Sequence, residues 1–500
     1  MRPLAHFIPA LGVLVLASSV SAHESEAIPV SQPANTSDGA PRPDWVQNLT
    51  MPDMPIRLDD RVIDYLVYFH DDPKGQERVR TWFERAQDFE PTIRAELRHA
   101  GLPEDLFYVT VVESGSEPRA RSRKGALGLW QFVRRTAARF HLARNRWVDA
   151  RIDPDLSTKA AGHYLSELYQ RFGTWELALA AYNMGPGALT QAMRKYNSND
   201  YTLLSQIEAG LPYETVFYVA RILACTIIGQ NRELFGLQDI DASRQAIARL
   251  ELPGGIPLSK IARASGTTLE RLRQLNPGLI RLRTPPSQAS WIVRLPAQDL
   301  ATFESRWRGR YSVFTEEKPP EAGNLETTSE RQTPVRSTRR TKPLTLPLFV
   351  AVPARQFHLP DRIHTFYRVR RAQRAHELAS EFGVLLKELC QWNHIDFRAP
   401  LQPGMILQLF LVRLPPQHEA ELIQAKDVNT SSIGSPDFFD HHEAARRRQR
   451  IVYTARAGDT LRSLARRYQL SVRSLSRINR FSRRTQLEAG QQLVIYAPQG

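Results

Sequence analysis

Cysteine is almost absent from this sequence, which has only Cys225 and Cys390 among its 500 residues. Two cysteines so far apart cannot build the dense disulfide framework of a small secreted scaffold, so stability must come from packed cores. Neither cysteine lies near the N-terminus, where a lipid anchor could be attached. We expect both to behave as small buried hydrophobic residues.

Long hydrophobic runs are also missing beyond Ala22. A helix that spans a bilayer needs about 20 apolar residues, so we expect no membrane span in the mature chain. The apolar stretch from Phe7 to Ala17 follows Arg2 and precedes small residues that end at Ala22. This pattern is typical of a secretory signal peptide over residues 1–22, with an uncleaved anchor as the alternative. We therefore predict export to the periplasm.

Acidic residues are too few to balance the basic ones, with 52 Asp and Glu against 67 Lys and Arg and a formal net charge of +15. This excess favours an anionic partner, which could be nucleic acid, a membrane headgroup or a wall polymer that carries carboxylates. With 42% hydrophobic residues and 34 prolines, the chain can form packed cores joined by linkers. Its length exceeds what one core usually organises, so we expect several domains.

The first folded region is predicted to be helical. Apolar residues recur at helical spacing from Val62 to Phe69, and helical patterns continue to about Phe235 with almost no strand-like alternation. The preceding residues, 23–57, are rich in Pro, Ser, Thr, Asn and Asp and are predicted to be a flexible tether. We therefore expect a mainly α domain over 58–240.

Three segments of the second half share one internal spacing. Ala262 to Asn276, Ala379 to Asn393 and Ala465 to Asn479 each span the same interval, and the apolar positions inside them coincide. In the last copy, β-type runs flank two short helical patterns, which predicts a small β-α-α-β unit of α+β class. The chain is thus expected to be multidomain. The predicted boundaries are 249–298, 362–414 and 450–498 for the repeats, with polar linkers at 299–350 and 415–449.

Glu113 is the strongest candidate for a catalytic residue. It ends a helical apolar run and precedes a loop rich in glycine and aromatic residues, Gly125 to Phe132. A carboxylate beside such a loop can be partly desolvated, which raises its pKa and keeps it protonated near neutral pH, as a general acid requires. Gln131 offers a directional amide and Trp130 an apolar wall. Taken singly, each residue has a simpler interpretation as a solvated charge or a core side chain.

Five sequence motifs favour the catalytic interpretation of these residues. The order and spacing of the motifs resemble those of the soluble-lytic-transglycosylase superfamily. The resemblance covers roughly residues 60–235. It implies a goose-lysozyme-like α fold that cleaves the β-1,4 bond between N-acetylmuramic acid and N-acetylglucosamine in peptidoglycan. The motifs are Gly101–Leu106, Glu113–Ser114, Gly128–Phe132, Ala181–Gly187 and Leu211–Thr215.

The same resemblance implies roles for individual residues. Glu113 is the expected acid/base, and the expected substrate-binding residues are Ser122, Gln131, Tyr182, Asn183, Tyr218 and, more weakly, Glu214. The chain departs from the family pattern at Ser116, where an aromatic is usual, and at Val133–Arg134, where a Met-Pro pair is usual. These departures concern the shape of the subsites, through altered specificity or local repacking, and leave the chemistry unchanged.

Ordinary glycosidases use two carboxylates, whereas the resemblance implies that one is sufficient here. Glu113 would protonate the glycosidic oxygen and then, as a carboxylate, take the proton of the muramic acid 6-hydroxyl as that oxygen closes on C1. The product would be 1,6-anhydro-N-acetylmuramic acid. Glu117 lies one helical turn beyond Glu113, but Pro118 follows it, so we expect the helix to end there and Glu117 to face solvent.

The third repeat resembles the LysM family, which binds glycans that contain N-acetylglucosamine. The resemblance rests on Ala457–Leu461 and Leu487–Gln491 and is weak in the first repeat. It implies glycan contacts from Gly458, Asp459, Thr460 and Asn479, so the expected partner is the glycan strand of peptidoglycan.

The first loop differs among the repeats. Gly458-Asp459-Thr460 of the third copy suits a turn against a sugar, whereas the second copy has Ala372-Gln373-Arg374 and the first has Gly255-Ile256-Pro257. Proline also removes a backbone donor, and Ser287 replaces the glycine found at 404 and 490. We therefore expect the third copy to be the main glycan binder and the first to be the weakest.

Two other functional classes fit parts of the sequence. An inactive wall-binding scaffold is the main alternative, opposed by the intact set of Glu113, Gln131 and Asn183. Nucleic-acid binding is suggested by a basic helix-turn-helix-like stretch at 464–475, but the flanking β-type runs and the export signal oppose it. Asp440-His441-His442-Glu443 lacks cysteine and a second ligand group at zinc spacing, so we expect no metal and no cofactor.

Overall fold

The computed structural model describes residues 43–52, 54, 55, 57–206, 210–240, 246–313, 348–355, 357–418, 421–470, 472–479 and 485–498. The predicted signal peptide and most of the predicted tether lie outside these residues. Within the described part of the chain, no helix is both long enough and apolar enough to cross a membrane.

The first domain is helical, as predicted. Aspartates begin several of its helices, because Asp59, Asp72 and Asp153 accept hydrogen bonds from the free backbone amides of the first turn. The helices are α1 (Asp60–Asp71), α2 (Pro73–Ala86), α3 (Glu90–His99), α4 (Tyr108–Ser114), α5 (Arg134–Arg139), α6 (Pro154–Phe172), α7 (Trp175–Met184), α8 (Pro186–Tyr196), α9 (Tyr201–Gln206) and α10 (Tyr213–Gln230), with short 3-10 turns η1 (Asp44–Asn48), η2 (Glu104–Phe107) and η3 (Ala150–Ile152).

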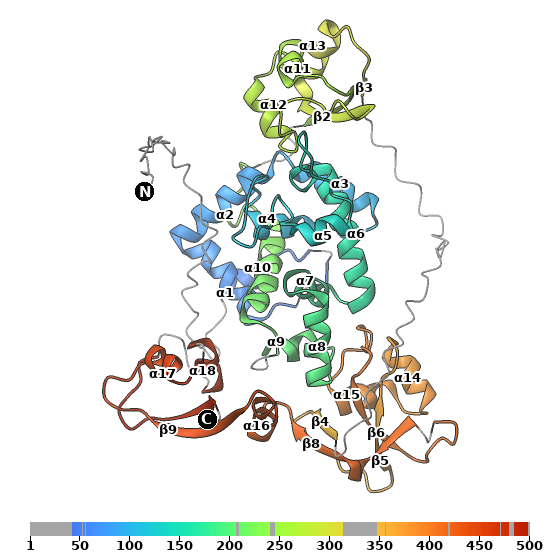
Figure 1. Ribbon diagram of the computed structural model, residues 1–500, viewed down its shortest axis with the longest axis vertical. Helices are drawn as coiled ribbons and strands as arrows, with labels where there is room; N and C mark the ends of the chain where they lie inside the picture. The colour runs from blue at the N-terminus through green and yellow to red at the C-terminus, as the bar shows by residue number, and fades with distance from the viewer. Residues whose placement is uncertain are drawn as a thin grey trace, which may run out of the picture.

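Helix α10 forms the centre of this domain. It is apolar on nearly all sides and packs against α1, α4 and α7 (Figure 1). Helices that are apolar all round are buried, and residues such as Val219, Ile222 and Cys225 are fully buried here. A rigid central helix of this kind fixes the positions of the side chains on α4 and α7 that face it.

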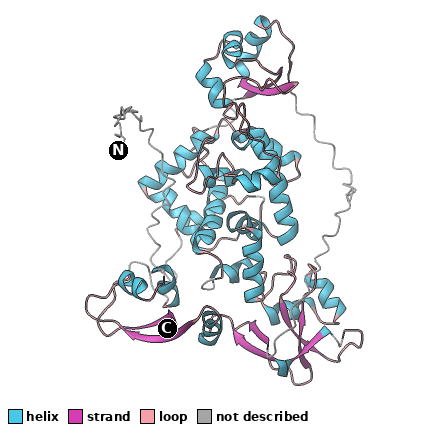
Figure 2. Cartoon of the chain, in the orientation of Figure 1, coloured by secondary structure: helices cyan, strands magenta, loops and turns pink. Residues whose placement is uncertain are grey.

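Each repeat forms the predicted β-α-α-β module, and strands occur in the described residues only in this second half of the chain (Figure 2). The two strands of each module pair antiparallel. The first module has β1 (Ile247–Pro253), α11 (Leu258–Ser265), α12 (Leu269–Leu275) and β2 (Ser290–Pro296); the second has β5 (Ile363–Arg368), α14 (Ala375–Glu381), α15 (Leu386–Asn393) and β6 (Ile406–Leu411); the third has β9 (Arg448–Thr454), α17 (Leu461–Arg467), α18 (Val472–Ile478) and β10 (Gln492–Pro498).

The repeated asparagine explains why the three copies share one internal spacing. In every module its side chain donates to a carbonyl one turn back in the second helix and exchanges two hydrogen bonds with the backbone of one residue in the last strand. The paired strand residues are Arg294 for Asn276, Gln408 for Asn393 and Val494 for Asn479. The asparagine therefore joins helix to strand.

Both stretches expected to be linkers contain regular structure. The first, 299–350, includes α13 (Leu300–Arg306), β3 (Ser312–Val313) and part of β4 (Leu348–Val352), and Phe303 of α13 is fully buried in the first module. The second, 415–449, includes β7 (Leu422–Gln424), β8 (Val428–Ser432), which pairs parallel with β4, and α16 (Pro436–Ala444). The polar composition of these stretches predicts linkers because it does not register single buried residues such as Phe303 and Phe438. The short turns here are η5 (Ala297–Asp299) and η7 (Ala425–Asp427).

The first module packs directly on the helical domain, in the region of η3 and α6 (Figure 1). Arg294 is 2% exposed and forms ion pairs with Asp153, at 3.1 Å, and with Asp155. The loop between α12 and β2 also contacts the domain, because Asp149 N donates to Gly278 O at 3.1 Å. Buried charges must remain paired, so this contact has one well-defined geometry.

The second module packs on the ends of α6 and α8 through the equivalent loop, between α15 and β6. Asn199 Nδ2 donates to the carbonyls of Asp396, at 3.0 Å, and Ala399, at 2.6 Å. Gln402 Nε2 donates to Arg171 O at 3.0 Å. Asn199 and Gln402 are both buried, so the loop is held tightly against the helical domain.

The third module is attached differently. Its strand β9 contacts α16, and Tyr496 of β10 donates a hydrogen bond to Asp440 of α16 at 2.7 Å. Helix α16 in turn packs on the helical domain, where the ring of Phe438 lies 5.2 Å from that of Tyr196. The third module therefore reaches the rest of the molecule through one intervening helix.

Candidate active site

Glu113 lies in the last turn of α4, where the helix meets the surface. The preceding residues of α4, Tyr108 to Val111, are buried and anchor it in the core. Gly115 ends the helix with a φ of 58°, and a Cβ there would lie 2.8 Å from the indole nitrogen of Trp82. Glycine is the residue that tolerates both constraints. Helix α4 thus stops immediately beyond Glu113.

The carboxyl group of Glu113 is held in an environment that favours its protonated form. Burial raises the pKa of Glu113 to about 7, opposed by a hydrogen bond from Tyr218 and by the positive charge of Arg221, while Glu214 raises it further. The Tyr218 hydroxyl donates to Glu113 Oε1 at 2.8 Å. Near neutral pH the group can therefore both donate and accept a proton.

Tyr182 and Asn183 lie at the end of α7 and connect it to neighbouring elements. The Tyr182 hydroxyl donates to Trp130 O at 2.8 Å, and the Thr215 hydroxyl donates to Asn183 Oδ1 at 2.8 Å. Both Tyr182 and Glu113 are partly buried, and the negative charge of Glu113 contributes to a Tyr182 pKa far above its usual value, after the larger effect of burial. The structure thus brings together Glu113, Tyr218 and Tyr182.

The glycine-rich loop is closed by its own side chains. Ser122 Oγ accepts from Ala126 N at 3.0 Å, and Gln131 Nε2 donates to the carbonyls of Ala120, at 3.0 Å, and Gly128, at 2.8 Å. Gln131 itself has a φ of 50°. Because the amide nitrogen of Gln131 serves the loop, its amide oxygen is the polar atom left to meet a ligand.

The remaining predicted residues are placed less centrally. Glu214 is exposed in the first turn of α10. Glu117 lies beyond the end of α4 rather than one turn further along it, because the helix stops at Ser114, and it is partly buried instead of fully solvated. Ser116 is 1% exposed. Because its side chain is buried, serine in place of the usual aromatic residue changes local packing and not the wall of an open subsite.

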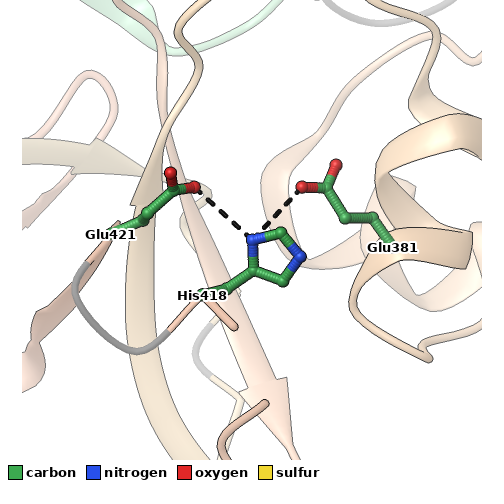
Figure 3. A group of neighbouring side chains, drawn as sticks. All are labelled: Glu381, His418 and Glu421. Carbon is green, nitrogen blue, oxygen red and sulfur yellow. Dashed lines mark ion pairs between the residues drawn. The ribbon is translucent and has the colours of Figure 1, made fainter. Parts of the chain in front are cut away.

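One group of side chains has the composition of a metal site. Glu381, His418 and Glu421 of the second module converge, with His418 Nδ1 3.5 Å from an oxygen of each glutamate (Figure 3). However, Arg370 already forms an ion pair with Glu421 at 2.8 Å, so a cation would compete with the guanidinium. One of the two glutamates is therefore already paired with a permanent positive charge.

The third module carries an open groove with a volume of about 460 Å³. Thr460 is the only one of the predicted glycan contacts that lines it. Sequence reasoning missed the other four lining residues, although Leu461 and Arg462 directly follow Thr460 in the chain. The groove is lined by Thr460, Leu461, Arg462, Val472 and Thr485.

The other predicted contacts have structural roles in the module. Asp459 Oδ2 accepts from the Tyr453 hydroxyl, at 2.7 Å, and from Arg456 N, at 2.9 Å. Asn479 joins α18 to β10, as described above. Gly458 has a φ of 85°, a conformation suited to glycine in a tight turn. Asp459 and Asn479 therefore support the loop and the strand, and their contact with glycan stays a prediction.

Comparison with known families agrees with this architecture. The profile of the transglycosylase SLT domain matches residues 90–204, and the LysM domain profile matches 367–410 and 453–495. A third profile, the LysM-like domain of lytic transglycosylase MltD, matches 246–308 and so includes α13. The chain therefore belongs to the lytic transglycosylases that carry an SLT domain followed by LysM domains, and the predicted fold class is confirmed.

Within that class, the chain is similar to the membrane-bound lytic murein transglycosylase D of Escherichia coli (strain K12), with 27% identity over 420 residues, 82% of this chain and 77% of that protein. A protein named for tributyltin chloride resistance in Alteromonas sp. (strain M-1) is 31% identical over 31% of this chain and 76% of its own length. The peptidoglycan transglycosylase gp16 of Escherichia phage T7 is 35% identical over 21% of this chain and 8% of its own length.

Proposed function

We propose that this protein is a peptidoglycan lytic transglycosylase that cleaves the β-1,4 bond between N-acetylmuramic acid and N-acetylglucosamine and leaves a 1,6-anhydro-N-acetylmuramic acid end. The observation that carries the proposal is the Glu113 carboxyl, whose pKa is raised to about 7 by burial and which accepts a hydrogen bond from Tyr218. A group poised near neutrality can protonate a leaving oxygen and later remove a proton.

The mechanism follows from one carboxyl group acting twice. Protonated Glu113 donates to the glycosidic oxygen as the bond to C1 breaks, and the resulting carboxylate is stabilised by the Tyr218 hydroxyl. It then takes the proton from the muramic acid 6-hydroxyl while that oxygen forms its bond to C1. The proton lost in the first step is recovered in the second, so the enzyme is unchanged and no water is consumed.

Several of the predicted substrate contacts are held in fixed positions by their own hydrogen bonds. Tyr182 and Asn183 are fixed at the end of α7, and the amide oxygen of Gln131 remains available from the loop. Ser122 supports that loop through its bond to Ala126. We propose that these side chains hold the sugars, with exposed Glu214 at the margin of the cleft.

The third module is the proposed glycan-binding module. In the first and second modules, the loop that follows the second helix lies against the helical domain, through Gly278 in one case and Asp396 and Ala399 in the other. In the third module the equivalent loop provides Thr485 to the open groove. The first two modules are therefore proposed to brace the enzyme, whereas the third holds the wall.

We also propose that residues 1–22 direct export and that the protein works in the periplasm against the glycan strands of the wall. The basic net charge of +15 suits a wall polymer that carries carboxylates. No cofactor or metal enters the proposed reaction, because proton transfer by Glu113 and attack by the 6-hydroxyl group complete it.

Digestion of purified insoluble peptidoglycan tests this function. The mature chain should release soluble muropeptides in proportion to enzyme concentration and time. A folded protein that binds the wall but releases nothing would instead be the inactive wall-binding scaffold.

A further inference from the structure

A second pocket lies on the helical domain, beside α5 and η3. Its volume is about 300 Å³, and three of its six lining residues are arginines. Neither the sequence motifs nor the proposed reaction accounts for it. The lining residues are Arg134, Ala137, Ala138, Leu142, Arg144 and Arg151.

The pocket carries a net positive charge. Asp149 holds the Arg151 guanidinium in place through two hydrogen bonds of 2.7 and 3.0 Å, and Arg144 Nε lies 3.5 Å from the same carboxylate. Arg134 is exposed and makes no ion pair with the described residues. The pocket lining thus carries three guanidinium groups and no carboxylate. Asp149 is already paired with Arg151 and Arg144, so the guanidinium of Arg134 is the one left to bind an anionic ligand in bidentate geometry.

The other side of the pocket is apolar. Ala137 and Leu142 are buried, with exposed fractions of 3% and 8%. A compact inorganic anion would leave this surface uncovered. A ligand that combines a carboxylate with a small aliphatic group would use both sides, as a short peptide with alanine-like side chains does.

The pocket lies next to the loop that carries the proposed substrate contacts. Arg151 Nη1 donates to Gly125 O at 3.4 Å, and a Cβ on Gly128 would lie 2.0 Å from Arg151 O. Arg134 follows Gln131 by three residues, so their Cα atoms are within about 11 Å of each other. A group attached to a sugar held by Gln131 could reach the arginines.

We propose that this arginine pocket binds a carboxylate of the peptide attached to the muramic acid of the substrate. The inference rests on the proposed function, because it assumes that a peptidoglycan strand occupies the cleft. Arg134 stands at one of the two places where the chain departs from the pattern of the family it resembles. On this proposal, the pocket makes the chain selective for peptide-bearing strands.

Paired substrates test the selectivity. The ratio of kcat/KM for peptide-bearing strands to that for strands stripped of peptide should fall about tenfold in Arg134→Gln, as expected for loss of one charged hydrogen bond. Arg135→Gln, an exposed neighbour outside the pocket, is the matched control and should keep the wild-type ratio. An unchanged ratio in Arg134→Gln overturns the inference, whereas failure of wild type on both substrates overturns the proposed function.

A direct binding experiment tests the arginine pocket independently of the proposed cleavage reaction. A tripeptide with free carboxylates should bind the wild-type full-length protein in an NMR titration, and both its diamide and the Arg134→Gln protein should give no saturable shift. This measurement involves no cleavage. Equal binding of the diamide, or displacement of the tripeptide by an equal concentration of inorganic phosphate, would contradict a peptide carboxylate site.

Discussion

Glu113 shows what sequence can and cannot establish about a single residue. Its position before a glycine-rich loop and inside an ordered set of motifs was sufficient to choose it. Its main partner, Tyr218, lies 105 positions away, and Arg221 acts on it from the same helix. The family resemblance implies that Tyr218 binds the substrate. Its hydrogen bond to the carboxyl group is revealed only by the packing of α4 against α10.

Substitution Glu113→Gln is expected to abolish cleavage while the fold remains intact. The amide keeps the shape of the side chain but cannot carry the proton in either direction, and general acid–base catalysis contributes about 10²–10⁴-fold. The measurement is release of soluble muropeptides, with circular dichroism to confirm folding. Glu117→Gln is the matched control and should be nearly silent, since Glu117 lies beyond the end of α4. Wild-type turnover by folded Glu113→Gln would remove Glu113 from the mechanism.

Substitution Tyr218→Phe should move the alkaline limb of the pH–rate profile. In wild type the pKa of Glu113 is about 7, so the protonated acid is lost, and the rate falls, as the pH rises through that value. The Tyr218 hydrogen bond lowers this pKa, and its removal must raise it. The limb should therefore shift to higher pH in Tyr218→Phe, together with a lower maximum. A limb that stays in place or moves to lower pH would contradict the role given to this hydroxyl.

At the level of elements, the internal spacing of the repeats predicted the modules correctly. The alanine-to-asparagine interval reflects a physical link, because the asparagine must reach the last strand from the end of the second helix. The stretches at 299–350 and 415–449, of which 314–347 lie outside the described residues, are predicted to be linkers but contain α13 and α16. Their helices are short, and each is held by one buried aromatic residue, Phe303 in α13 and Phe438 in α16. One buried residue in a short helix does not produce a hydrophobic periodicity that can be recognised in the sequence.

Asn393→Ala should weaken the second module locally. The change removes three hydrogen bonds and leaves the buried backbone of Gln408 unpaired, which costs about 1–3 kcal/mol for each unsatisfied group. Amide hydrogen exchange at Gln408 should accelerate by at least tenfold. Lys387→Ala, an exposed change on the same helix, should leave that exchange rate as in wild type. Unchanged exchange in Asn393→Ala would show that the asparagine does not join helix to strand.

At the scale of the molecule, the three modules share a fold but differ in how they are attached to the helical domain. Two lie directly on the helical domain through the loop after their second helix, and the third is joined through α16 (Figure 1). Differences in the first loop predict unequal glycan binding by the three modules, which stays a prediction. The sequence could not predict the docking, because contacts such as Arg294 with Asp153 depend on how separate domains pack.

Removal of residues 450–500 should abolish most retention of the protein on insoluble peptidoglycan, because the remaining modules present their equivalent loops to the helical domain. Retention is measured by co-sedimentation, with the soluble fraction checked for folding. Arg374→Thr, at the position that corresponds to Thr460, is the control and should leave retention unchanged. Equal sedimentation with and without the third module would refute the ranking of the repeats.

The most direct test of the central claim is the mass of the products released from purified peptidoglycan by the wild-type protein. Attack by the muramic acid 6-hydroxyl consumes no water, so the muropeptides should carry 1,6-anhydro ends and be lighter by one water than hydrolysed ones. They should also resist borohydride reduction. Reducible N-acetylmuramic acid ends as the main product would make the protein a hydrolase and contradict the mechanism built on Glu113.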